Sequence, residues 1–318
     1  MFRIILILMM VSCGRGASSK LNEAIDYYNA PSRLADSQVS NVDKLPLTGS
    51  SGISAWRGSW MPYSSGGTTV ITAQYDRAVT QGSFPAWTWE QSQVTQFSGV
   101  SWAGHCNGLA AASIMAPEPK RSVTYRGVTF SAEDIKILLI ELWQNAETIV
   151  IGTRCSSPNP DTTNGRMTDS LCRDVNSGAF HLAVTNWLGV FKFPIIADYE
   201  AAEAVWNYPI IAYRVTKRAP LSALDAMYWL DGIKTNVYSY NSLARAWEYI
   251  VMEVTLTSGV KSYEYILELD EQRNIIGGEW FRDSKRNHPD FLWRATAPRP
   301  ENPYLDSATI QEIARQSV

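Results

Sequence analysis

The stretch that most constrains this chain of 318 residues runs from Ser101 to Pro119, SWAGHCNGLAAASIMAPEP. Its apolar, alanine-rich part predicts a helix that begins near Cys106 and ends before Pro117. A cysteine in the first helical turn lies among free backbone N–H groups, which together with the helix dipole favour a thiolate. Cys106 is therefore either a small apolar filler or a nucleophile. The residues around it favour the nucleophile: Trp102, Gly104, His105 and Asn107.

Composition limits the classes of protein to which this chain can belong. The chain is 45% hydrophobic and 19% charged, which is enough for one large domain or two small ones with a true core. The net charge is −3 and there is no basic cluster, so we expect no nucleic-acid partner. Twelve tryptophans and fifteen tyrosines indicate an aromatic core or an aromatic-lined groove, and composition does not separate the two.

The first residues read as an export signal. Arg3 precedes an apolar run that is too short to span a bilayer, a pattern typical of a secretory signal. The segment Met10–Cys13 resembles the box at which bacterial lipoprotein signals are cut and the cysteine is lipidated. The alternatives are lipidation of Cys13, which would anchor the protein without spanning the membrane, and a plain cleaved signal. Gly14 after the cysteine favours the outer membrane or the cell surface.

The domain organisation expected from composition has three parts. Residues 1–13 are the signal, residues 14–50 form a polar tether, and residues 51–318 form the catalytic domain. We expect a secreted or lipid-anchored protein whose contact with a membrane is limited to the lipid at Cys13.

Export also changes how the cysteines are read. Without Cys13 the chain keeps Cys106, Cys155 and Cys172. An oxidising compartment favours a disulfide between Cys155 and Cys172, which would stabilise the fold by about 3 kcal/mol. The alternatives are two free thiols or a zinc pair, although no histidine or cysteine lies at metal-ligand spacing. Cys106 is then the thiol without a structural role, and nucleophilic catalysis is the leading explanation for it.

Residue patterns predict several local structures. Thr68 to Tyr75 reads as a strand, and Val123 to Phe130 as a hairpin around Arg126-Gly127. Ser131 with Asp134 predicts a capped helix start. The segment 178–198 allows two interpretations: a helix with His181 on its flank, or two strands whose turn brings His181 close to Asp198.

A cysteine, then a histidine, then an aspartate is the chain order of thiol acyl-transfer enzymes. The histidine keeps the sulfur ionised and protonates the leaving group, and the carboxylate orients the histidine. Among three histidines we prefer His181 with Asp198, and His288 with Asp290 is the alternative. His105 adjoins Cys106 and would point elsewhere. The backbone N–H of Cys106 is a natural oxyanion donor, and the side-chain candidates are Trp102 and Asn107. We predict no metal site and no cofactor, since no EF-hand-like loop is present.

Several longer motifs, in order, resemble the transglutaminase elicitor family, best described from oomycete cell-wall glycoproteins. The resemblance runs from about Trp56 to the end and rests on SWAGHCNGLAAASIMAPEP, VTYRGVTFSAEDIK, CRDVNSGAFHLAVTN, AVWNYPIIAYRV and IIGGEWFRDSKRNHPDFLW. The segment Val205–Lys217 is similar to the surface peptide of oomycete members that plants recognise. Trp206, Asn207 and Pro209 are kept, whereas Tyr208, Ile211 and Ala212 differ from it.

The resemblance implies an α+β thiol enzyme of papain-like or transglutaminase-like type, with the nucleophile at a helix N-terminus packed on an antiparallel sheet. It implies a protein-glutamine γ-glutamyltransferase with Cys106 as the nucleophile, acting on protein glutamines and amine donors. The rival expectations are a cysteine protease or amidase on the same residues, and a surface recognition protein in which Cys106 is inert. Some transglutaminases need calcium, and the sequence leaves that requirement open.

Overall fold

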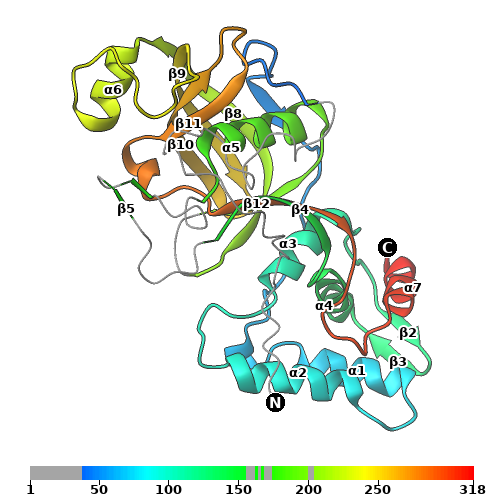
Figure 1. Ribbon diagram of the computed structural model, residues 1–318. Coiled ribbons are helices and arrows are strands. Elements are labelled where there is room, and N and C mark those ends of the chain that lie inside the picture. Colours follow the sequence, from blue (N-terminus) through cyan, green and yellow to red (C-terminus); the bar gives the residue numbers. More distant parts are fainter. Residues whose placement is uncertain (1–37, 155–161, 164–165, 168–173, 200–203) are drawn as a thin grey trace, which may run out of the picture.

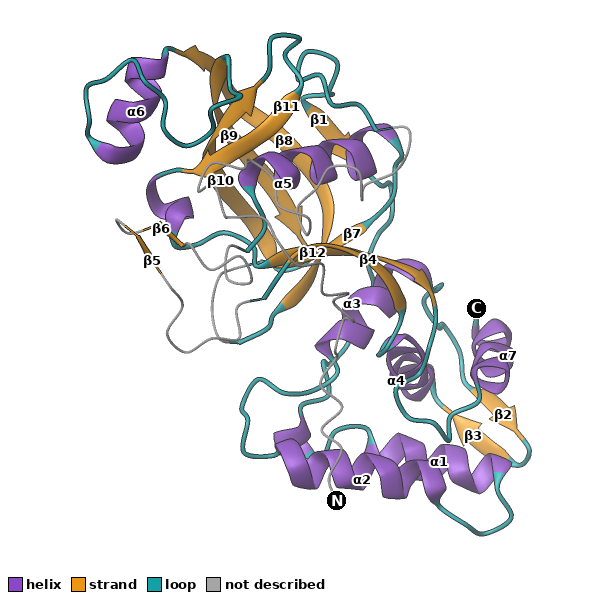
Figure 2. Ribbon diagram, viewed as in Figure 1, coloured by secondary structure: helices purple, strands orange, loops and turns teal. Residues whose placement is uncertain are grey.

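The computed structural model describes residues 38–154, 162–163, 166–167, 174–199 and 204–318. The chain forms two lobes, one built on a curled antiparallel sheet and one mainly of helices (Figure 1). Figure 2 shows that β4, β12 and α3 lie where the lobes meet. The predicted signal, Cys13, Cys155 and Cys172 lie outside the described residues, so lipidation and the disulfide stay predictions.

The sheet lobe is one antiparallel sheet of eight strands. Along the sheet the order is β11-β10-β9-β8-β7-β12-β4, with β1 added beside β8. These strands are β1 (Thr48–Ser50), β4 (Glu147–Gly152), β7 (Ile195–Asp198), β8 (Asn207–Leu221), β9 (Ala246–Leu256), β10 (Gly259–Leu269), β11 (Ile275–Trp280) and β12 (Phe291–Ala297). Register shifts in β8 and β12 bend the ladder, as bulges do, and help the sheet to curl.

One helix packs against the sheet and closes its core. Helix α5 (Ser177–Val184) continues into a π-helical turn, η5 (Thr185–Val190), and lies against β10 and β11. Its side chains are buried on all sides, which is typical of a helix inside a core rather than on a surface. The apolar core of this lobe includes Phe180, Trp187 and Tyr265.

The helical lobe has its own apolar core, which includes Tyr75, Phe130 and Leu138. Its elements are η3 (Tyr63–Ser65), α1 (Thr69–Val79), α2 (Pro85–Phe97), α3 (Cys106–Met115), β2 (Val123–Tyr125), β3 (Val128–Phe130), α4 (Ala132–Trp143) and α7 (Ser307–Ser317). The remaining elements are β5 (Thr162–Thr163), β6 (Arg166–Met167), α6 (Ala223–Asp231) and η6 (Arg282–Lys285).

Two local predictions in the helical lobe are confirmed and one is wrong. Strands β2 and β3 form the hairpin expected around Arg126-Gly127. Ser131 and Asp134 form a complete capping box at the start of α4. The strand expected from Thr68 to Tyr75 is instead helix α1. Ile71, Tyr75 and Ala78 are buried on one face of that helix, so tertiary packing outweighs the local β-branched run.

Both interpretations of segment 178–198 hold for part of it. The first apolar run is helical, as the side-chain stripe predicts, and His181 lies within α5. The second run is strand β7, which ends at Asp198.

The domain begins earlier than the boundary at residue 51 that composition suggested. Residues 38–50, placed in the tether by that reading, pack against the sheet lobe. Val42 and Leu45 are buried in its core, and β1 pairs with β8. Asp43 forms ion pairs with Arg218 and Arg273, so this segment is tied down by charge as well as by burial.

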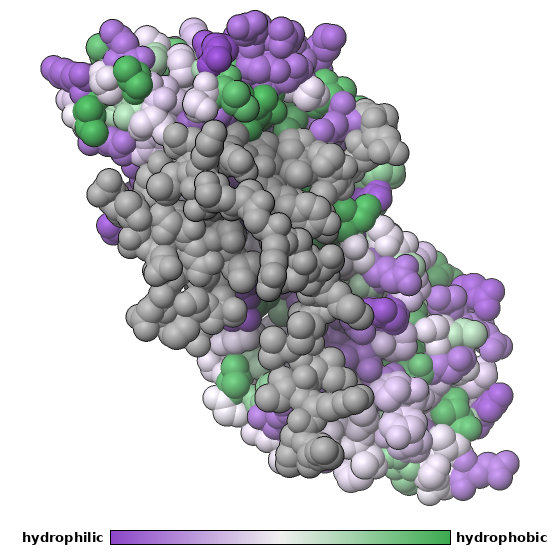
Figure 3. Space-filling view, in the orientation of Figure 1, coloured by the Kyte–Doolittle hydropathy of each residue, from purple (hydrophilic) through white to green (hydrophobic). Residues whose placement is uncertain are grey.

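The surface over α6 carries scattered apolar side chains (Figure 3). Tyr228 is 49% exposed and Ile233 is 53% exposed. None of the helices in the described part of the chain combines the length and the apolar character that crossing a bilayer requires.

Candidate active site around Cys106

Cys106 is the first residue of α3, as the sequence predicts, and the residue is half-buried. The sulfur lies 3.6 Å from Oδ1 of Asn107 and 3.7 Å from the carbonyl oxygen of Val205. Helix α3 packs on α4 on one side and on β8 on the other, so Cys106 lies where the lobes meet. Gly108 makes the α4 contact possible, because a Cβ there would lie 2.2 Å from the carbonyl oxygen of Ile140.

A chain of side-chain hydrogen bonds fixes the start of α3 to the sheet. The indole Nε1 of Trp293, in β12, donates to Oδ1 of Asn207 at 2.7 Å. The amide Nδ2 of Asn207, in β8, then donates to Oδ1 of Asn107 at 2.6 Å. Asn107, the residue that follows Cys106, is therefore bonded directly to β8 and, through Asn207, to β12.

Asp198 is brought to the Cys106 site by the end of β7, opposite Asn207 in the register of β7 and β8. Its Oδ1 accepts a hydrogen bond from the backbone N–H of Trp206 at 2.8 Å. Burial raises the pKa of the Cys106 thiol, hydrogen bonds from Asn207 lower it, and the Asp198 carboxylate raises it further. The net shift of the pKa is upward, opposite to what the helix N-terminus alone predicts, because desolvation of the sulfur outweighs the hydrogen bonds that it receives.

The structure does not bring His181 to Cys106 or to Asp198. Its imidazole is 3% exposed inside the sheet-lobe core, and Nδ1 lies 2.8 Å from the hydroxyl of Tyr265. Burial lowers the pKa of His181 to about 3, so the ring is neutral at ordinary pH. The pair predicted from chain order is not formed, because α5 turns His181 toward β10 while Asp198 lies at the end of β7.

His288 lies on the segment that leads into β12 and is also buried, at 8% exposure. Its Nδ1 lies 2.7 Å from the carbonyl oxygen of Ser284, and its Nε2 lies 3.0 Å from Oδ2 of Asp174. Its ring stacks on Trp280 with centroids 5.1 Å apart. The carboxylate that orients His288 is therefore Asp174, not the predicted Asp290.

Asp290 links the His288 segment to Asp198. Its backbone N–H donates to the carbonyl oxygen of Asp198 at 3.2 Å, and the next residue pairs with Asp198 in the sheet. Burial, together with the charges of Asp174 and Asp198, raises the pKa of Asp290 to about 8, while Arg154 opposes the shift. A cluster of three acidic side chains thus connects His288 with the end of β7 that faces Cys106.

The two side-chain oxyanion candidates lie in different surroundings. Asn107 touches the Cys106 sulfur through its Oδ1, which also accepts the bond from Asn207. Trp102 instead stacks under the guanidinium of Arg154, with 5.2 Å between the guanidinium carbon and the ring centroid. Of the two, Asn107 is the one that contacts the sulfur in the described structure, and it does so through an acceptor atom.

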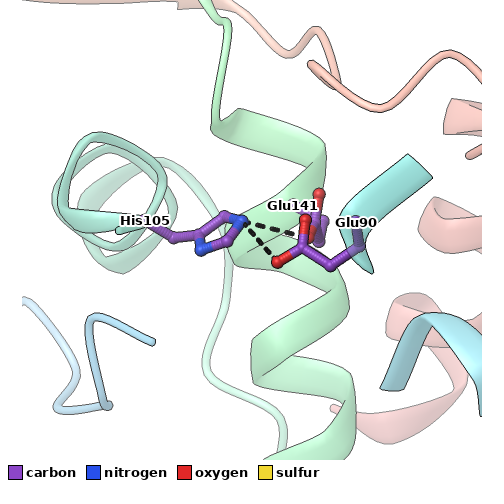
Figure 4. A group of neighbouring side chains, drawn as sticks. All are labelled: Glu90, His105 and Glu141. Carbon is purple, nitrogen blue, oxygen red and sulfur yellow. Dashed lines mark ion pairs between the residues drawn. The ribbon is translucent and has the colours of Figure 1, made fainter. Parts of the chain in front are cut away.

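His105 points away from Cys106, as expected, but into an unexpected group. Its Nε2 lies 3.2 Å from Oε1 of Glu141 and 3.6 Å from Oε1 of Glu90 (Figure 4). Burial lowers the pKa of His105, but the two carboxylates outweigh burial and raise it well above the ordinary value. This is a potential metal-ligand set, which sequence reasoning missed because its members come from three separate helices.

Sequence reasoning also missed Val205, Asn207 and Asp174. The motif AVWNYPIIAYRV was noted only as a family signature, yet it supplies the carbonyl of Val205 and the amide of Asn207 to the Cys106 site. An asparagine at the first position of a buried strand was the one available signal. Asp174 follows a run of mainly polar residues in the sequence and carried no signal of its own.

The comparisons with known proteins agree with this architecture. The structure is similar to the crystal structure of the GP42 transglutaminase from Phytophthora sojae, with a TM-score of 0.75 and 21% sequence identity. The match covers 93% of this chain and 99% of that chain, and at this identity it shows the fold alone. No curated protein matches the sequence. The family model for the transglutaminase elicitor matches residues 80–260 and 252–313, so the chain belongs to the transglutaminase elicitor family.

Proposed function

We propose that the protein is a protein-glutamine γ-glutamyltransferase that works through a thioester on Cys106. The sulfur attacks the γ-carboxamide carbon of a protein glutamine, the C–N bond breaks, and ammonia leaves. A primary amine then attacks the thioester carbonyl, the C–S bond breaks, and an isopeptide or amide product forms. The thiol is restored with its proton, so each cycle consumes one glutamine amide and one amine and releases one ammonia.

The observation that carries this proposal is the placement of Cys106. Within the described residues Cys106 is the free cysteine. It is half-buried, and it is the first residue of the helix α3 that lies between the two lobes. Its backbone N–H is in the first turn, where it can donate to a developing oxyanion. Membership of the family supports the same reaction class.

We assign the base to His288 and its orientation to Asp174. In this scheme His288 takes the thiol proton, gives it to the departing ammonia, and later takes a proton from the attacking amine. The support is topological: β12 starts beside Asp198, and Asp198 acts electrostatically on Cys106. His181 lacks this connection, since its only side-chain hydrogen bond in the described residues goes to Tyr265. Ring reorientation away from Asp174 or Ser284 would accompany the proton transfer.

The partners of this reaction are protein glutamines and amine donors. A secreted or lipid-anchored location, as proposed from the first residues, would place both substrates outside the cell.

Three measurements on the purified chain test the proposal: incorporation of a fluorescent primary amine into dimethylated casein, ammonia release, and the mass of the trapped acyl-enzyme. We expect the wild type to incorporate the amine. In Cys106→Ala the rate of amine incorporation should fall by about 1,000-fold or more. Ser113→Ala is the matched control, because Ser113 lies on the same helix and its hydroxyl donates to the carbonyl oxygen of Ala110, away from the sulfur's contacts.

The other outcomes separate the rivals. Ammonia release with no amine incorporation at saturating amine would identify a hydrolase. Full activity in Cys106→Ala, or a folded wild type with neither activity nor thiol labelling of Cys106, would contradict the enzyme proposal altogether.

A further inference from the structure

Three side chains from three helices meet in the core of the helical lobe, just before the nucleophile. Glu90 comes from α2, Glu141 from α4, and His105 caps the start of α3 (Figure 4). Glu90 and Glu141 are fully buried and His105 is 1% exposed. One ligand atom of each lies within 4.8 Å of the others.

The surroundings orient each of these groups. Nδ1 of His105 lies 3.1 Å from the carbonyl oxygen of Met61, which can only accept, so Nδ1 carries the proton and Nε2 points into the group. The backbone N–H of Thr68 donates to Oε1 of Glu90 at 2.9 Å, and its hydroxyl donates to Glu141. A histidine that donates its second N–H to a backbone carbonyl is the usual arrangement behind a metal ligand.

The group is short of positive charge. A protonated imidazole compensates only one carboxylate, and among the described residues His105 is the one cation that pairs with Glu90 and Glu141. Oε2 of Glu90 and Oε2 of Glu141 are buried and have no hydrogen-bond partner among the described residues. Unpartnered buried carboxylate oxygens indicate a missing ligand, because leaving them empty costs free energy.

The backbone approaches this group so closely that a larger residue would obstruct it. A Cβ on Gly67 would lie 2.2 Å from Oε1 of Glu90, and Gly67 has a positive φ of 56°. The ring of Tyr63 covers His105, with centroids 5.0 Å apart. The three ligands are thus held on one side by a glycine turn and on another by an aromatic ring.

We propose that Glu90, His105 and Glu141 bind a divalent transition-metal ion of the Zn²⁺ class. Ligand atoms of a tetrahedral zinc site lie about 3.4 Å apart. Nε2 of His105 lies 3.2 Å from Glu141 and 3.6 Å from Glu90, and all three ligand atoms lie within 4.8 Å of one another. One nitrogen and two carboxylate groups fit this class better than Ca²⁺, which takes six to eight oxygen ligands. The ion would tie α2 and α4 to the start of α3, one residue before Cys106.

The test uses the full chain, with any affinity tag removed, after chelation and dialysis. Zn²⁺, Mn²⁺, Co²⁺ and Ca²⁺ are added separately, and bound metal, the visible absorption of Co²⁺ and Tm are measured. We expect about one equivalent of Zn²⁺ or Co²⁺ per chain, Co²⁺ bands typical of a low-coordinate site, and a higher Tm. Glu141→Gln and Glu90→Gln should each weaken Zn²⁺ binding by more than about 10- to 100-fold. That range is the usual loss when a residue that only hydrogen-bonds to a metal ligand is replaced, and here a ligand itself is replaced.

Glu248→Gln is the matched control, since Glu248 is a buried carboxylate paired with Arg218 and Arg273 in the other lobe, and it should bind Zn²⁺ like the wild type. Absence of Co²⁺ bands and of any Tm shift in folded wild type would overturn the proposal, even if the variants do not fold. The group would then be an imidazolium between two carboxylates. Stabilisation by Ca²⁺ alone, or Zn²⁺ binding unchanged in both glutamine variants, would also contradict it.

Discussion

Asn207 at the start of β8 donates its side-chain amide to Oδ1 of Asn107 in the first turn of α3, at 2.6 Å. Cys106 lies one residue before Asn107, so this bond joins the candidate nucleophile to the sheet. Trp293 in β12, on the other side of β7, extends the link by donating to Asn207. The position of the sulfur thus depends on a strand that follows it by about 100 residues in the sequence.

Replacing Asn207 should therefore disturb the site as well as the fold. In Asn207→Ala the indole of Trp293 and the amide of Asn107 lose their partner, and we expect the free energy of unfolding to fall by about 1 to 3 kcal/mol. Amine incorporation should fall by more than the loss of folded protein explains. Denaturant unfolding and kcat/KM measure the two effects. Tyr208→Phe is the control on the same strand, and equal activity in both variants would contradict the link.

The two candidate histidines should behave in opposite ways. His288→Gln should lower kcat per folded molecule by about 100-fold or more, as removal of a general base does, whatever its effect on Tm. His181→Gln should lower Tm and leave kcat per folded molecule near the wild-type value, because His181 is a core residue bonded to Tyr265. Asp174→Asn should give an intermediate loss of kcat, since it only orients His288. A loss of kcat in His181→Gln and none in His288→Gln would return the base to His181.

Burial of neutral His181 should make the protein less stable in acid. The pKa of His181 is about 3 in the fold and about 6.5 in the unfolded chain, so below pH 6.5 the unfolded state binds the additional proton. Stability is complete above pH 6.5 and falls as pH drops toward 3, by about 1.4 kcal/mol per pH unit. Urea unfolding from pH 7 to 4 measures how the free energy of unfolding changes with pH. In His181→Gln this slope should be smaller by about 1.4 kcal/mol per pH unit. An identical slope in both proteins would show that His181 is not buried in the neutral state.

Asp290 should have the opposite pH dependence at higher pH. Its pKa is about 8 in the fold against about 3.8 unfolded, so between these values the unfolded state has lost a proton that the folded state keeps. Its contribution to stability is therefore complete below pH 4 and is lost as pH rises to 8. Asp290→Asn should be more stable than the wild type at pH 8, by a few kcal/mol, and close to it at pH 4. Thermal unfolding at both values checks this, and a variant equally destabilised at both would contradict it.

Local patterns predicted the elements whose signals lie within a few residues. The capping box at Ser131 and Asp134, the hairpin at Arg126-Gly127 and the helix start at Cys106 all depend on neighbours along the chain. The same reasoning failed for Thr69–Val79, where burial of Ile71 and Tyr75 against other elements decides in favour of a helix. It also placed residues 38–50 outside the domain, because their contacts with Arg218 and Arg273 are distant in sequence.

The sequence by itself determined the family and the helix that begins at Cys106, and it left open whether a strand ends at Asp198. Only the tertiary structure decided which side chains surround the sulfur. Chain order made His181 the natural partner of Asp198, yet α5 buries it against Tyr265, while the sheet brings Asn207 and Asp198 to Cys106. The Glu90, His105 and Glu141 group was equally invisible along the chain. Side chains from three helices come together only when the helices pack and bury their surfaces, and the spacing of residues along the sequence does not predict that packing.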